Sequence, residues 1–148
     1  MNSGNAARTA LAGIRIFNGA VGLFAANQMA ERLGGDLGDD KRFVYPARMF
    51  GIRTLVLGVD LLTLRANDAS ARRVLSQAVL IHASDTAAAA YAGYRRELPV
   101  KAAAFTTAIS GVNTALAVIS LTAYLRSGAA AAEPAPRALD QEQDPANT

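Results

Sequence analysis

VKAAAFTTAISGVNTALAVISLTAYL, residues 100–125, is the stretch that decides the fold. It has no charged side chain between its second residue, Lys101, and the arginine that follows it, and it exceeds the roughly 20 residues that a helix needs to cross a bilayer. Small and polar residues recur along it every three or four positions, on one helical face. They are Thr106, Ser110, Asn113, Ala117 and Ser120. The stretch predicts a membrane-spanning helix that packs through this face.

Three further apolar segments precede it, at residues 9–29, 44–64 and 74–94. Polar stretches with turn-forming residues separate the segments. None of them has the broad charged face of a soluble amphipathic helix. We therefore expect an all-α fold, a four-helix transmembrane bundle made by residues 1–126 and placed in the cell membrane as a multi-pass protein. A soluble four-helix bundle is the alternative.

The end of the chain differs from the rest in composition. Residues 127–148 are rich in alanine, proline and acids, with one arginine against four carboxylates, whereas the whole chain has a net charge of +3. Such a segment buries too little apolar area to offset the entropy of ordering, so we expect a disordered acidic tail.

The basic residues of the body sit mostly at the edges of the apolar segments. This placement favours the lipid bilayer as partner over nucleic acid. The basic residues divide almost evenly between the two sides of the membrane, so they do not determine the orientation of the chain. A location of both termini inside is slightly favoured, because the acidic tail then need not cross the membrane. Arg15 interrupts the first segment, which therefore does not resemble a signal peptide.

The sequence offers few metal ligands. It has no cysteine and a single histidine, His82. Zinc, copper and non-haem iron sites usually need two or more imidazoles or thiolates. We expect no metal and no cofactor.

Ionisable residues inside the apolar segments are the best functional signal. Charge at bilayer depth is expensive, so such side chains normally face a bundle interior and pair with one another. We predict a polar centre made by these residues, to which the segment at residues 100–125 adds the amide of Asn113. We expect Asp85 to pair with an arginine of another helix. The predicted centre comprises Arg15, Arg53, Asp60, His82, Asp85 and Asn113.

A short repeated motif, Gly-Ile-Arg, occurs in each of the first two segments. Gly13-Ile14-Arg15 occurs in one and Gly51-Ile52-Arg53 in the other. The match predicts two helical hairpins related by a repeat, and shared helix-packing needs are the alternative explanation.

The stretch ARMFGIRTLVLGVDLL at residues 47–62, followed by HASDTAAAAYAG at residues 82–93, resembles small four-helix bacterial membrane proteins with a DoxX-like layout. The resemblance covers roughly residues 8–126. It implies a compact four-helix membrane protein without an assigned molecular role, in which Arg53 and Asp85 match the arginine and the acid of the family. His82 and Asp60 have no secure counterpart there.

Two functions remain open, with a proton- or ion-coupled transporter subunit as a background case and a purely structural polar network as the simplest interpretation of the charged residues. The first is a membrane protein that binds a lipid-like molecule or partner helices around the polar centre, with a homodimer through the small-residue helix faces as one form. The second is a membrane-embedded enzyme for a lipophilic substrate, in which His82 and Asp85, three positions apart on one helix, act as acid and base. Motifs of soluble enzymes, such as a P-loop or HExxH, are missing from the sequence.

Overall fold

The computed structural model describes residues 3–32, 44–65 and 70–132. These residues form five helices and no strand, which confirms the predicted all-α class. The helices are α1 (Ser3–Phe24), α2 (Ala26–Arg32), α3 (Val44–Thr63), α4 (Ala71–Tyr94) and α5 (Val100–Ala132).

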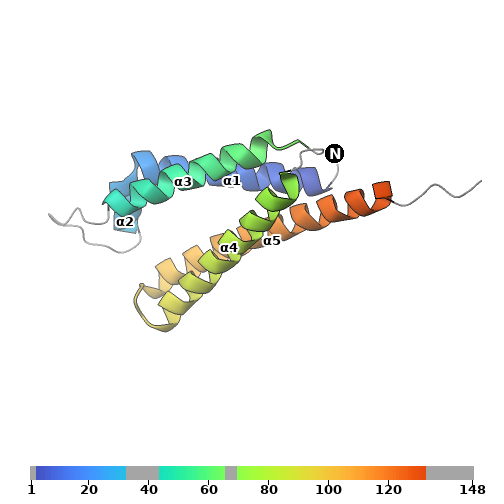
Figure 1. Ribbon diagram of the computed structural model, residues 1–148. Coiled ribbons are helices and arrows are strands. Elements are labelled where there is room, and N and C mark those ends of the chain that lie inside the picture. The colour runs from blue at the N-terminus through green and yellow to red at the C-terminus, as the bar shows by residue number, and fades with distance from the viewer. Residues whose placement is uncertain (1–2, 33–43, 66–69, 133–148) are drawn as a thin grey trace, which may run out of the picture.

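The four long helices form two hairpin-like pairs. The most extensive packing joins α1 with α3 and α4 with α5, while α1 also contacts α5. Figure 1 shows the two pairs crossing near the start of α1 and moving apart from there, so that α2 and the α4–α5 turn lie well separated on the same side of the molecule. The pairs therefore meet at one end and diverge at the other.

Glycines bring α1 and α3 into backbone contact. A Cβ added to Gly51 would lie 2.5 Å from the backbone nitrogen of Leu23, and one added to Gly19 would lie 2.8 Å from the carbonyl oxygen of Gly51. Further along, a Cβ on Gly58 would lie 3.1 Å from the carbonyl oxygen of Ala12. Packing through small residues is common between membrane helices, because it lets the two backbones approach closely.

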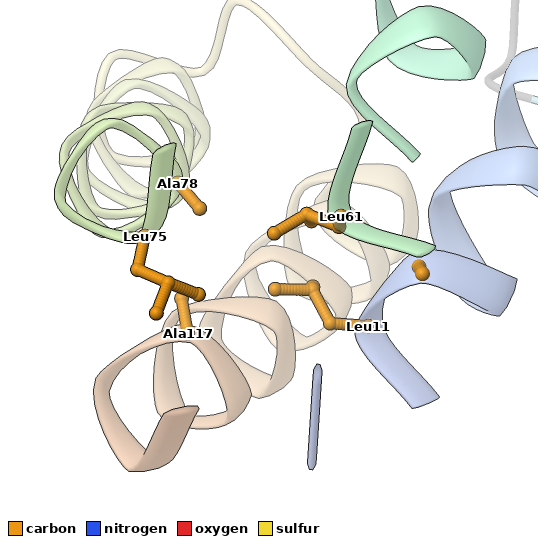
Figure 2. Close-up of a cluster of buried hydrophobic side chains, with 6 residues drawn as sticks. Leu11, Leu61, Leu75, Ala78 and Ala117 are labelled. Atoms are coloured by element: carbon orange, nitrogen blue, oxygen red, sulfur yellow. The ribbon is translucent and has the colours of Figure 1, made fainter. Parts of the chain in front are cut away.

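The apolar core lies where the two pairs cross. Figure 2 shows side chains from α1, α3, α4 and α5 converging there. The buried members are Leu11, Ala12, Leu61, Leu75, Ala78 and Ala117. The largest fully buried side chains are Leu11 and Leu61, so the apolar core is small.

Two boundaries differ from the sequence expectations. The first apolar segment is divided at Ala25, so that α1 ends at Phe24 and the short α2 follows. Helix α5 continues to Ala132, beyond residue 126 where we expected disorder to begin. Its last residues are alanines, which have the highest helix propensity. The remainder of the expected tail, residues 133–148, lies outside the described residues.

One described helix is long and apolar enough to cross a membrane. It is the segment Val100–Gly128 of α5, with a mean hydropathy of 1.6. Only 22% of the residues in its apolar 18-residue stretch are buried by the rest of the chain. The expected span at residues 100–125 falls within it. The other described helices do not meet the same criterion of length and apolarity, so the expectation of four spans is not confirmed.

The Gly-Ile-Arg motif does not mark equivalent positions. Gly13 is exposed and Arg15 is buried, whereas Gly51 is buried and Arg53 is exposed. The two triplets present opposite faces to the interior, so the hypothesis of a repeat based on them is wrong.

Candidate functional site

A cleft opens between the two helix pairs on the side where they diverge. Its volume is about 1150 Å³. The second half of α1 and the first half of α3 form one wall, and the second half of α4 and the first half of α5 form the other. The lining is mainly apolar, including Phe17, Phe50 and Phe105, with polar groups from Arg15, His82, Asp85 and Asn113.

Arg15 and His82 join α1 to α4 in this cleft. The side chains are only 4% and 3% exposed. The Nη1 group of Arg15 lies 3.2 Å from Nδ1 of His82 and within hydrogen-bonding reach of Nε2. An arginine in a protein only donates hydrogen bonds, so the imidazole nitrogen facing it must be an unprotonated acceptor. His82 is therefore a neutral ring that holds the guanidinium in place.

Two buried polar atoms of side chains that line the cleft have no partner among the described residues. They are Nε of Arg15 and Oδ1 of Asn113. One is a donor and the other an acceptor, and both side chains line the same cleft. Most buried polar groups in proteins are hydrogen-bonded, so the missing hydrogen bonds of these two atoms would have to come from water or from a bound molecule.

Asp85 adds negative charge beside this pair. Its side chain is partly buried, and its carboxylate and the guanidinium of Arg15 attract each other. The attraction is not a direct contact, since the only close ion pair within the described part of the chain joins Arg95 and Glu97. The expected pairing of Asp85 with an arginine of another helix is therefore not confirmed: Arg15 is the arginine whose charge acts on Asp85, but the two side chains form no salt bridge.

Arg53 and Asp60 do not join the site. Both are exposed on α3, and neither lines the cleft. Each follows a buried glycine, Gly51 or Gly58, by two positions, and two positions turn a helix by about 200°. The glycines pack on α1, so the two charged residues point away from it. Placing them in the bundle interior was wrong for this geometric reason, and the family arginine implied by the resemblance therefore lies outside the cleft.

The interior face predicted for α5 does point inward, and so does His82 of α4, which was predicted for the polar centre. Ala78 and His82 of α4 are buried, as are Asn113 and Ser120 of α5. A further contact joins these helices, because the hydroxyls of Thr86 and Thr114 lie 3.1 Å apart. The small and hydroxylated residues thus serve packing within the chain.

Most of the residues that line the cleft were not predicted as site residues, and three of them bear on its chemistry. Phe17 and Phe105 line its walls, and Lys101 also lies on the lining. A sequence signal existed only for Lys101, as the single charge at the start of an apolar segment. The aromatic residues gave none, because an exposed phenylalanine on a membrane helix is normally lipid-facing.

The arrangement suits binding better than acid–base chemistry. His82 already accepts a hydrogen bond from Arg15, and it makes none to Asp85 among the described residues. The contact between His82 and Asp85 that the enzyme alternative requires is therefore not among the hydrogen bonds of the described residues, and that alternative stays a prediction. No group of three or more histidine or acidic side chains able to hold a metal ion occurs within residues 3–32, 44–65 and 70–132.

Comparison with known proteins adds no family assignment. No protein-family model, no curated protein and no solved structure matches this chain.

Proposed function

We propose that this chain is a multi-helix membrane protein whose cleft binds one lipid-like molecule with an uncharged, hydroxyl-bearing head. The observation that carries the proposal is the pair of buried, unpartnered atoms, Arg15 Nε and Asn113 Oδ1, in one apolar-walled cleft. Leaving a buried polar group unsatisfied costs about 1–3 kcal/mol. A ligand that hydrogen-bonds both atoms removes that cost.

The distribution of apolar side chains supports membrane insertion. Large hydrophobic residues are exposed on all four long helices, whereas the interior is mostly alanine, glycine and polar groups. Soluble monomers rarely expose apolar patches of more than a few hundred Å². Helix α5 has the composition of a span and is little buried by the rest of the chain. In a bilayer, lipid chains cover these apolar surfaces, so they are not exposed to water.

The size and walls of the cleft support a lipid-like ligand. Its volume of about 1150 Å³ leaves room for a chain as well as a head. Pockets for drug-sized molecules usually measure about 300–1,000 Å³. Phe17, Phe50 and Phe105 supply apolar contact area along the walls. A hydrocarbon chain can lie between these rings while its head reaches the buried polar groups.

The free polar atoms favour an uncharged head with hydroxyl groups. Asn113 Oδ1 and the carboxylate of Asp85 are acceptors, so a matching head must donate hydrogen bonds, and Arg15 Nε–H requires it to accept one. A carboxylate or phosphate head has no hydrogen to give and would bring negative charge towards Asp85. The charge of Arg15 is already balanced in part by Asp85. A glycerol-type head, with hydroxyls and a carbonyl, meets all three needs.

A tryptophan reporter tests this proposal, because the chain has no tryptophan of its own. Phe105→Trp places one in the cleft wall, and Leu80→Trp places a control on the exposed surface of α4, where the native side chain is 68% exposed. The purified variants are titrated in nanodiscs with 1-oleoylglycerol, methyl oleate, oleate and oleylamine, and tryptophan emission is recorded.

We expect a saturable change with 1-oleoylglycerol for Phe105→Trp and not for Leu80→Trp. Adding Asn113→Leu, which keeps the shape but removes the acceptor, should weaken binding about fivefold to tenfold, the equivalent of one hydrogen bond. Equal responses at both reporters would mean bulk lipid contact and would overturn cleft binding. Tighter binding of oleate, oleylamine or methyl oleate would retain a lipid site but overturn the hydroxyl-bearing head.

A further inference from the structure

The exposed face of α3 carries two opposite charges that the cleft does not use. Arg53 and Asp60 are seven positions apart, which places them on nearly the same line along the helix, two turns from each other. Both are exposed, and neither forms an ion pair with another described residue. Between them the exposed surface is apolar, with Val56 49% exposed.

With α3 in the bilayer, as the proposed function has it, uncompensated charges on its exposed face are costly. On insertion scales, an arginine or an aspartate at the centre of a membrane helix costs about 2.5–3.5 kcal/mol. Pairing with an opposite charge in a protein interface lowers that cost. The described helices do not provide such a partner within the chain, whereas a second copy carries both of the charges that are needed.

We propose that the Arg53–Val56–Asp60 face of α3 is a homodimer interface in which two α3 helices pack antiparallel about a twofold axis. In a twofold interface the same patch meets itself, so that residue i contacts j and j contacts i. A centre at Val56–Leu57 places Arg53 of each copy opposite Asp60 of its partner. Two equivalent ion pairs then flank an apolar centre, and all four charges are neutralised.

The antiparallel arrangement requires the two copies to lie in opposite orientations in the bilayer. The basic residues permit this, because they divide almost evenly between the two ends of the helices. One copy must then translocate its acidic tail, against the slight preference of that tail for the inside.

The rest of α3 leaves this face available. The opposite face of the helix, with Gly51 and Gly58, is occupied by α1. Contacts of α3 with α4 are few, and Figure 1 shows α3 at the outer edge of the molecule. Ile52 and Val59, both exposed, border the charged line and add apolar area to the contact. The small-residue faces that suggested a homodimer in the sequence are used within the chain, so the dimer surface is a different one.

Single cysteines give a direct test, because the chain contains none. Val56→Cys places a thiol beside the twofold axis, and Leu80→Cys places one on the exposed surface of α4 as a matched control. Membranes containing each variant are oxidised, and disulfide-linked dimer is measured on non-reducing gels. We expect linked dimer for Val56→Cys, several times more than for Leu80→Cys. Equal yields from the two variants would overturn the interface.

Charge exchange tests the pairing itself. Arg53→Asp makes the face wholly acidic and Asp60→Arg makes it wholly basic, so either variant alone should lose dimer about tenfold or more through like-charge repulsion. Co-expression of the two variants with different tags should restore association, since each acidic position of one chain would then face a basic position of the other. Helical circular dichroism of each variant confirms folding. Folded single variants that dimerise as well as the original chain, or failure of the mixture to associate, would contradict the proposal.

Discussion

The guanidinium of Arg15 on α1 is held by the imidazole of His82 on α4, and this contact spans the two helix pairs just beyond the apolar core. Both side chains are almost fully buried. The contact engages Nη1 of the guanidinium and leaves its buried Nε–H without a partner among the described residues. One interaction therefore joins the two halves of the bundle and prepares the proposed binding site.

Replacing His82 tests this structural role. His82→Leu leaves a buried guanidinium without its acceptor, and we expect it to lower the free energy of unfolding by about 2–3 kcal/mol, since hydrogen bonds to charged groups are the stronger kind. His82→Gln keeps an acceptor and should lose about half as much. Thermal unfolding followed by circular dichroism in detergent measures both. If His82→Leu and His82→Gln were equally stable, the hydrogen bond to Arg15 would not contribute to stability.

The second prediction concerns stability and follows from the backbone contact of α1 with α3. In Gly51→Ala the new Cβ would lie 2.5 Å from the backbone nitrogen of Leu23, so the helices must move apart. We expect a loss of about 1–3 kcal/mol, as for other overpacked sites.

Gly13→Ala is the matched control for Gly51→Ala. No atom lies within 4 Å of a Cβ at Gly13. Alanine in place of a glycine in an open helix position should add about 0.5–1 kcal/mol of stability. The same unfolding experiment compares the two variants, and a stable Gly51→Ala protein would show that α1 and α3 are not packed through this glycine.

Membrane insertion predicts the behaviour of the protein during fractionation. The exposed apolar side chains and the α5 segment Val100–Gly128 should keep the chain in the membrane pellet through an alkaline carbonate wash. Detergent should then be needed for extraction. Recovery of a monodisperse protein from the soluble fraction without detergent would contradict the membrane proposal, although the cleft and the Arg15–His82 contact would stand.

The sequence predicts the long helices and the inward face of α5 well, because intervals of three and four residues define a helix face directly. His82 and Asn113 were placed correctly by this rule, and both are buried. The same rule, applied strictly, separates Gly51 from Arg53 by about 200°. Either the glycines or the charged residues of α3 could therefore face inward. Packing against α1 selects the glycines, and the sequence pattern of α3 alone carries no information about that packing.

The cleft could not be predicted from the sequence. It exists because the two helix pairs cross at Leu11 and Leu61 and diverge beyond them. The crossing depends on how the side-chain surfaces of four helices fit together. Residues such as Phe17 and Phe105 acquire a place in the cleft only through that arrangement, and their own positions in the sequence are those of ordinary apolar helix residues.

The turn between α4 and α5 provides the last prediction. Arg96 has a positive φ of 58°, a left-handed conformation that glycine usually adopts at the end of a helix. The backbone N–H of Glu97 donates to the carbonyl of Ala92 at 2.9 Å, and that of Arg96 donates to Gly93 at 3.1 Å, which is the Schellman pattern. A side chain in this conformation costs about 1 kcal/mol. Arg96→Gly should therefore raise the free energy of unfolding by about that amount, whereas Arg95→Gly, at a φ of −74°, should not. Thermal unfolding of the two variants beside the original chain measures the difference, and a destabilised Arg96→Gly would mean that the arginine side chain contributes more than its strained backbone costs.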